Sequence, residues 1–190
     1  MNSFVHLHNH SEYSLLDGMS NLEKMVARVK ANNQPSIAIT DHGNMYGAVE
    51  FYKLSKKYDV KPIIGLEAYC AIEDSLKKNN DEKSPYHLTL LAENETGYQN
   101  LMKMVTHANL KGFYYKPRID KKILEENNEG IIVLSGCPSS ELSRSIVSNN
   151  EEKIKSTYGW FSDVFQDRFY LEIMDHIGVP NQKTINKKLI

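Results

Sequence analysis

Two kinds of apolar pattern alternate along this chain, and this alternation limits its possible folds more than any other feature. Short apolar runs typical of strands occupy residues 4–8, 36–40, 61–70, 87–92, 130–137 and 168–174. Apolar residues at helical spacing predict helices over 20–33, 47–58, 95–110, 139–149 and 151–165, and another beginning at Pro180. Strands that alternate with helices favour a parallel sheet, either open or closed as a barrel.

The number of predicted strands limits the architecture further. Six strands can be counted, whereas an eight-stranded barrel usually needs about 250 residues. We therefore expect one α/β domain over residues 1–190 that ends before its last strand–helix units. Ser20 and Glu23 have the spacing of a capping box, which predicts where the first long helix begins.

Composition excludes several classes of protein. A formal net charge of −1 argues against a chain that coats nucleic acid by charge alone. Cys70 and Cys137 are far apart, which favours a reducing compartment over a disulfide framework. No apolar run approaches the ~20 residues of a membrane span, and the N-terminus lacks a signal-peptide pattern. We expect a soluble, cytoplasmic protein.

Ionisable side chains gather where the predicted strands end. The first strand leads into His6, His8 and His10, which a period of two would place on one face. The later strands bring Asp41 and His42, then Glu67, then Cys137, and finally Asp175 and His176. The ends of parallel strands meet at one edge of the sheet. His87 stands at the start of its strand and needs an antiparallel or bent strand to join them.

These residue types indicate a metal site. Imidazole, thiolate and carboxylate groups favour zinc, iron or manganese over magnesium alone. Their spread over several strands suggests more than one metal, an arrangement that suits the hydrolysis of phosphate esters. Taken singly, a histidine at a strand end is more often structural, and a buried cysteine is more often a small hydrophobe. The convergence of about seven such residues favours metal binding.

Several segments together resemble the PHP (polymerase and histidinol phosphatase) domain family. Within it, they resemble the branch found at the N-terminus of bacterial DNA polymerase III alpha subunits. They are HLHNHSEYSLLDG, AITDHGNMYGAVEFY, KPIIGLEAY, YHLTLLAENETGYQNLMKM and VLSGCPSSEL. The resemblance implies a distorted seven-stranded (β/α) barrel with up to three divalent metals, zinc, manganese or iron, at its mouth. The ligands it implies are His8, His10, Asp17, His42, Glu67, His87 and Cys137. Glu67 would bridge two metals, and His6 and Asp41 would support the ligands.

The resemblance also implies a function. The parent protein would be a DNA-directed DNA polymerase, with DNA (the primer 3′ end) and other replisome subunits as partners. The domain itself would be a metal-dependent phosphoesterase, a proofreading 3′→5′ exonuclease that attacks phosphorus with a metal-bound hydroxide. A metal-stabilised scaffold and a stand-alone phosphatase remain alternatives. Arg118 is a candidate phosphate clamp, with a structural salt bridge as an equal alternative, and His107 and His176 are expected to be structural.

The last ligand motif of the family, an Asp-x-His pair, is absent from the sequence. The segment MDHIG, residues 174–178, has the wrong spacing. We therefore expect the pair to lie beyond Ile190, so that residues 1–190 form a PHP domain truncated at the C-terminus and without the polymerase domains.

Overall fold

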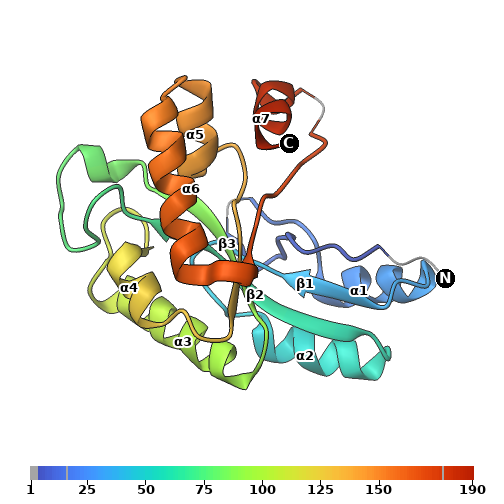
Figure 1. Cartoon of the computed structure of the whole chain (residues 1–190). Helices are drawn as coiled ribbons and strands as arrows, with labels where there is room; N and C mark the ends of the chain where they lie inside the picture. Colours follow the sequence, from blue (N-terminus) through green and yellow to red (C-terminus); the bar gives the residue numbers. More distant parts are fainter. Residues whose placement is uncertain (1–3, 16, 177) are drawn as a thin grey trace.

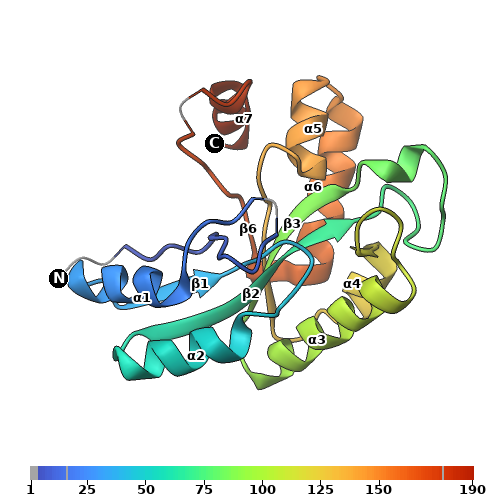
Figure 2. The same cartoon turned by 180° about the vertical axis from the view of Figure 1, so that it is seen from behind.

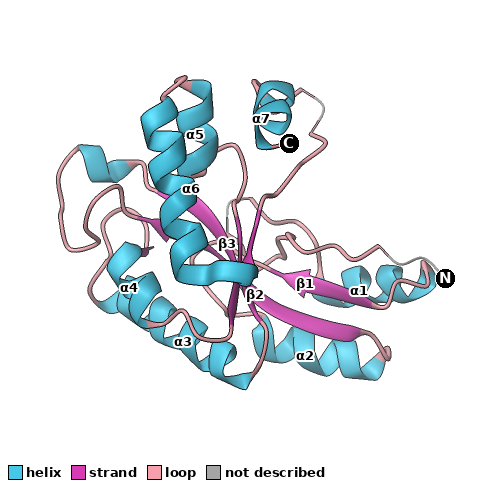
Figure 3. Cartoon of the chain, viewed as in Figure 1, coloured by secondary structure: helices cyan, strands magenta, loops and turns pink. Residues whose placement is uncertain are grey.

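The computed structural model describes residues 4–15, 17–176 and 178–190, which contain six β-strands and seven α-helices (Figures 1 and 3). The strands are β1 (Ser36–Ile39), β2 (Lys61–Cys70), β3 (Tyr86–Ala92), β4 (Arg118–Ile119), β5 (Ile131–Leu134) and β6 (Phe169–Tyr170). The helices are α1 (Leu22–Ala31), α2 (Ala48–Lys57), α3 (Glu95–Leu110), α4 (Lys121–Glu126), α5 (Glu141–Val147), α6 (Glu151–Phe165) and α7 (Gln182–Leu189). Within these ranges, no helix is both long and apolar enough to cross a membrane. The α/β class expected from the sequence is confirmed.

Most of the helices begin at a polar residue that accepts a hydrogen bond from the first turn. These caps are Asn94 for α3, Asp120 for α4, Ser140 for α5 and Asn150 for α6. At α1 the cap is Asn21, whose side chain accepts from the N–H of Lys24. The predicted capping box of Ser20 and Glu23 is therefore wrong. Ser20 instead pairs with Ser11 in a short parallel bridge.

The sheet is mixed, whereas the sequence favoured a parallel one. Its order is β1-β2-β3-β5-β6, with β4 also paired to β2. β1 runs parallel to β2 and β5 parallel to β6, but β3 is antiparallel to both of its neighbours. Residues 71–85 join β2 to β3 without an α-helix, so the chain returns alongside β2 in the opposite direction. The start of β3 consequently lies beside the end of β2.

Two main groups of buried apolar residues hold the helices on the sheet. Helices α1 and α2 pack with β1 through residues such as Val26, Ile37 and Phe51. Helices α3, α4 and α6 pack with the central strands around Leu90 and Phe165. Burial of each such large side chain contributes about 1.5–3 kcal/mol. Figures 1 and 2 show α2 and α3 side by side along one side of the sheet and α5 and α7 at the opposite end, with α6 running from α5 back to the centre of the molecule.

The predicted first strand, residues 4–8, is only partly formed. Its main chain bridges β1 at His6 and Ile37, and the N–H of Ala38 donates to the carbonyl of His6 at 2.9 Å. The backbone bends at His8, so the period of two that would align the three histidines does not continue across this residue. The segment still follows β1 to its end, where the N–H of Thr40 donates to the carbonyl of Asn9.

Candidate metal centre

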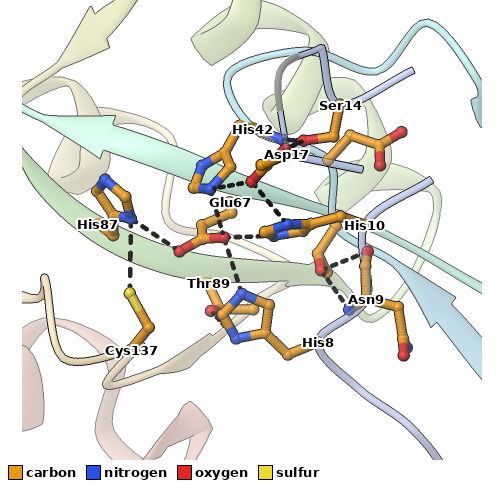
Figure 4. A network of polar contacts seen from close by, with 12 residues as sticks. His8, Asn9, His10, Ser14, Asp17, His42, Glu67, His87, Thr89 and Cys137 are labelled. Carbon is orange, nitrogen blue, oxygen red and sulfur yellow. Dashed lines mark hydrogen bonds and ion pairs between the residues drawn. The ribbon is translucent and has the colours of Figure 1, made fainter. Parts of the chain in front are cut away.

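The seven predicted ligands form one connected network centred on Glu67 (Figure 4). His8 and His10 come from the N-terminal segment, Asp17 from the loop before α1, His42 from the loop after β1, Glu67 from β2, His87 from β3 and Cys137 from the loop after β5. Residues separated by well over a hundred positions thus meet at one edge of the sheet, as the distribution of polar residues predicts.

Glu67 faces four imidazole rings. Its side chain is 1% exposed, and its Oε2 atom lies 2.9 Å from Nε2 of His8, 2.5 Å from Nε2 of His10 and 3.2 Å from Nε2 of His42. Its Oε1 atom lies 3.1 Å from Nδ1 of His87. A single buried carboxylate is thereby surrounded by four rings from three separate parts of the chain: the N-terminal segment, the loop after β1, and β3.

Asp17 provides a second carboxylate on one side of this centre. Its Oδ2 atom lies 2.9 Å from Nδ1 of His10 and 3.0 Å from Nε2 of His42. Its Oδ1 atom accepts a hydrogen bond from Oγ of Ser14 at 2.6 Å, and Ser14 accepts one from the N–H of His42 at 3.1 Å. The two ring nitrogens of His10 therefore face two different carboxylates, which fixes the orientation of the ring.

Cys137 joins the network through His87. Its Sγ atom lies 3.5 Å from Nδ1 of His87 and accepts a hydrogen bond from the N–H of Ser139 at 3.4 Å. His87 reaches the cluster because β3 is antiparallel to β2, which places it opposite Tyr69. The antiparallel arrangement that His87 required is therefore present.

Asp41 ties the N-terminal segment to the sheet beside the ligands. Its carboxylate is 1% exposed and accepts hydrogen bonds from both the N–H and the hydroxyl of Ser11, at 2.6 and 2.8 Å. Burial raises the pKa of Asp41, although the bonds from Ser11 oppose this change. Its carbonyl accepts the N–H of Glu67 at 3.1 Å. Asp41 therefore lies beside the candidate ligands, and the supporting role expected for it stays a prediction.

The charges of the cluster are strongly coupled. Burial alone would raise the pKa of Glu67, but hydrogen bonds from His10, His8 and His87 hold it far below its usual range. Burial alone would lower the pKa of His8, but hydrogen bonds to Glu172 and Glu67 raise it to about 10. Burial alone would also lower the pKa of His10, but its hydrogen bond to Glu67 raises it. Positive charge is therefore favoured around Glu67, and a divalent cation can take the place of these protons.

Two other ligand candidates are neutral in this environment. Burial lowers the pKa of His42 to about 4, so its ring is unprotonated at neutral pH, as a metal ligand must be. Its Nδ1 atom is buried without a hydrogen-bond partner among the described residues. Burial, and then the charge of Glu67, raise the pKa of Cys137 to about 12. A metal bound to this sulfur must displace the thiol proton.

The donor set fits a divalent metal. Three overlapping groups bring their ligand atoms within 4.8 Å of one another: His8–His10–Glu67, His10–Asp17–His42 and His42–Glu67–His87. Sets of imidazole and carboxylate suit zinc, manganese or iron. The cluster opens into a pocket of about 440 Å³ that is also lined by Asn9, Ser139 and Met174.

Glu172 and Thr89 belong to this network but were missed in the sequence. Oε1 of Glu172 lies 2.7 Å from Nδ1 of His8, and Oγ1 of Thr89 lies 3.1 Å from the same nitrogen. Thr89 also donates to Oε2 of Glu172 at 3.4 Å. The signal was a glutamate near the end of a predicted strand, the same position that identified Glu67. In the sequence, Asp175 and His176 stand out because they directly follow that strand, and neither of them is assigned as a ligand.

The phosphate-clamp role expected for Arg118 is wrong. Its side chain is 0% exposed and forms a salt bridge at 3.0 Å with Glu82, which is also buried. Its other donors bond to the carbonyls of Gly112, Ser75 and Lys77. Burial leaves the guanidinium inaccessible to a substrate phosphate, and the alternative of a structural salt bridge holds.

Three further histidines lie outside the ligand groups. His6, expected to support the ligands, is exposed, and its ring meets Phe4 edge-on at 4.8 Å. Among the described residues it forms no side-chain hydrogen bond with the cluster. His107 lies 3.0 Å from Oγ of Ser75, in a structural contact. His176 is exposed and lines the pocket without joining a ligand group of the described residues.

The fold and the cluster define a mixed α/β protein with a histidine–carboxylate centre of the kind that binds divalent metals. The profile of the PHP domain family matches residues 6–176. The chain belongs to this family.

Curated relatives place the chain more narrowly. It is 47% identical to DNA polymerase III subunit alpha of Borreliella burgdorferi over 98% of its length, and 44% identical to that of Thermus aquaticus over 98%. Its identity to the Helicobacter pylori protein is 43% over 99%. The chain spans 16% of the length of each of these relatives.

A solved structure shares the fold. It is that of a candidate metal-dependent phosphoesterase from Bifidobacterium adolescentis, which aligns with a TM-score of 0.60 at 13% identity. The alignment covers 100% of this chain and 82% of that one. At this identity the likeness extends to the fold alone.

Proposed function

We propose that this chain is the N-terminal PHP domain of a DNA polymerase III alpha subunit, and that the domain is a metal-dependent phosphoesterase that removes nucleotides from a DNA 3′ end. The relatives support the first statement. The observation that carries the second is Glu67, whose buried carboxylate faces four imidazoles. In the longer protein, the primer 3′ end and other replisome subunits would be the partners.

The residues of the cluster have separate roles in this proposal. A divalent metal bound here would supply Lewis-acid polarisation of a phosphate oxygen and activation of water. Glu67 lies between the pair His8 and His10 on one side and His87 on the other, a position suited to bridging two metals. Asp17 holds His10 and contacts His42. Burial of Glu67 keeps its carboxylate away from bulk water, which strengthens its attraction for cations.

We further propose that chain beyond residue 190 completes the domain as a seven-stranded barrel and supplies the family's Asp-x-His pair. Support comes from the two outer edges of the sheet, which are the N-terminal segment beside β1 and the residues after β6. A groove of about 1010 Å³ separates the N-terminal segment from the residues that follow β6, and both sides contribute apolar residues such as Val5, Leu7, Leu171 and Ile173. A strand placed there would pair both edges and remove them from solvent.

The decisive experiment measures metal content and nuclease activity together. Purified protein, as this chain and as the full-length relative, is analysed by plasma mass spectrometry and assayed on a labelled single-stranded oligonucleotide. We expect bound metal and 3′→5′ degradation, both lost in His8→Ala and Glu67→Gln. His6→Ala is the matched control, because its exposed ring lies outside the ligand groups, and it should retain both.

Each alternative predicts a different result. Bound metal without hydrolysis of any phosphate ester would identify a scaffold that the metal only stabilises. Hydrolysis of small phosphate esters but not of DNA would identify a phosphatase. Nuclease activity that persists in both ligand variants would place the reaction elsewhere in the protein and refute the proposal.

A further inference from the structure

A tightly closed turn, residues 112–118, lies beside the cluster and has no role in the metal centre itself. The N–H and Nε–H of Arg118 both donate to the carbonyl of Gly112, at 3.4 and 3.1 Å. A Cβ at Gly112 would lie 2.0 Å from the carbonyl oxygen of Arg118, so only glycine permits this closure. Within the turn, Tyr114 donates to the carbonyl of Lys116 at 3.0 Å, and Tyr115 has a φ of +58°. The turn therefore presents its side chains from a fixed backbone.

The turn places Lys116 at the rim of the cluster. Tyr69 lies two residues after Glu67 on β2, so both side chains point to the same face. The ring of Tyr69 stacks on that of His42 with a centroid distance of 5.2 Å, and Nζ of Lys116 lies 5.3 Å from the centroid of Tyr69. One aromatic ring thus separates the ammonium of Lys116 from a candidate metal ligand.

The exposed side chains of the turn combine positive charge with aromatic rings. Lys116 is exposed and, among the described residues, has no carboxylate within 4.0 Å. Phe113 is 51% exposed and Tyr115 is 65% exposed. Nζ of Lys83 lies 5.4 Å from the centroid of the Tyr115 ring. Lysines beside exposed rings are the combination with which proteins hold single strands, binding phosphates by charge and bases by stacking.

We propose that the 112–118 turn binds the single-stranded end of a polynucleotide and leads it to the metal centre. Lys116 binds a backbone phosphate next to the cluster, and Tyr115 stacks on a base. This proposal rests on the proposed phosphoesterase function and specifies its substrate as a strand, not a small ester. It also gives Arg118 an indirect part, since the buried guanidinium holds the turn but does not touch the strand.

The test measures binding separately from hydrolysis. Fluorescence anisotropy follows a labelled oligothymidine of about 12 nucleotides on the full chain, with Ca²⁺ in place of metals that support hydrolysis. Lys116→Ala should raise Kd about tenfold, the loss of a charged hydrogen bond. It should also reduce the slope of log Kd against log salt concentration by about 0.7, the value for one phosphate contact on a single strand.

Aromatic and control variants complete the experiment. Tyr115→Ala should raise Kd about fivefold or more and leave the salt slope unchanged, because stacking involves no counterion release. Lys53→Ala and Tyr52→Ala, at exposed positions on α2, are matched controls and should leave Kd unchanged. Metal content should be equal in all five proteins, which shows that the cluster is intact.

The outcomes separate this inference from the function on which it rests. Suppose that binding depends on Lys116 and Tyr115, but the full-length relative hydrolyses no phosphate ester when metals that support hydrolysis replace Ca²⁺. That result would support the inference about the turn and refute the phosphoesterase proposal. Hydrolysis of DNA with an unchanged Kd in both variants would overturn the inference about the turn but would leave the phosphoesterase proposal standing. Absence of oligothymidine binding, with or without hydrolysis of small esters, would also overturn it.

Discussion

Glu172 illustrates how single residues outside the ligand set determine the geometry of this centre. Its carboxylate contacts Nδ1 of His8, while Nε2 of the same ring points at Glu67. A carboxylate on one ring nitrogen fixes the tautomer and the orientation of a histidine that binds metal through the other. The main-chain N–H of Glu172 is itself held by Oγ of Ser135 at 2.8 Å. We therefore regard Glu172 as a positioning residue for His8.

Replacement of Glu172 should weaken metal binding without removing a ligand. We expect Glu172→Ala to lower the affinity for Mn²⁺ or Zn²⁺ about 10- to 100-fold, the usual effect of losing such a partner. Titration calorimetry on chelator-treated protein measures it. Asp175→Asn removes an exposed carboxylate three residues later and should leave the affinity unchanged. Equal affinity in Glu172→Ala and wild type would mean that His8 needs no such orientation.

The sequence predicted which residues form the cluster better than it predicted their surroundings. His8, His10 and Glu67 lie near the ends of predicted strands, which a parallel arrangement brings to one edge. Asp17 lies in a loop and His87 at a strand start, so this rule alone does not place them.

As a residue type, Arg118 suits a phosphate clamp as well as a structural salt bridge. Only its burial against Glu82, which depends on how residues 71–85 fold back, shows that it is structural. Burial of this kind is a tertiary property without a local pattern.

At the scale of elements, the ion pair of Arg118 and Glu82 anchors the long connection between β2 and β3. Glu82 also accepts hydrogen bonds from the N–H groups of Ile72 and Glu73, at 2.9 and 2.8 Å.

Arg118→Met would leave the buried carboxylate of Glu82 without its cation, which costs about 3–5 kcal/mol. Urea denaturation should show this loss. Arg118→Met combined with Glu82→Gln should recover part of it, and an equal loss in the double variant would show that the charge of Glu82 is not the cause.

Asp120 joins the same connection to the start of α4. Its carboxylate accepts the N–H of Ile123 at 3.0 Å and both the N–H and the hydroxyl of Ser75. Burial alone would raise the pKa of Asp120, but these hydrogen bonds hold it below its usual range. A carboxyl with a lowered folded pKa stabilises the protein above its unfolded pKa of about 3.9, and this contribution is lost as pH falls through the folded pKa.

Asp120→Asn should therefore destabilise the protein in a pH-dependent manner. Asparagine can still cap a helix, so the variant isolates the effect of charge. We expect a lower free energy of unfolding near neutral pH, with the difference from wild type shrinking below about pH 4. Urea denaturation at both pH values measures this. Asp167→Asn, for which no side-chain hydrogen bond is seen among the described residues, is the control. A difference that is constant with pH would exclude the charged form as the source.

The elements that could be predicted were those long enough to show the spacing of their apolar residues. Helix α3 spans sixteen residues, and its apolar spacing predicted both of its ends. β4 has two residues and α4 has six, too few to show a period, and both were missed. The direction of β3 was also beyond the pattern, since alternation along a strand is the same for parallel and antiparallel pairing. The position of His87 was the one local sign that a strand ran the other way.

At the scale of the whole molecule, the cluster joins segments that lie far apart in the sequence. The N-terminal segment, β2 and β3 all place side chains around Glu67, so bound metal should stabilise the entire fold. A ligand at 100 times its Kd adds about 2.7 kcal/mol, and for a chain of this size each kcal/mol raises Tm by about 2–4 °C. We expect Zn²⁺ or Mn²⁺ to raise Tm by about 5–11 °C, as measured by calorimetry before and after chelation.

His8→Ala should abolish most of this rise in Tm. His6→Ala, in the same segment but outside the ligand groups, should retain it. A shift of equal size in both variants would indicate metal bound elsewhere, and it would remove the cluster from its role in holding the molecule together.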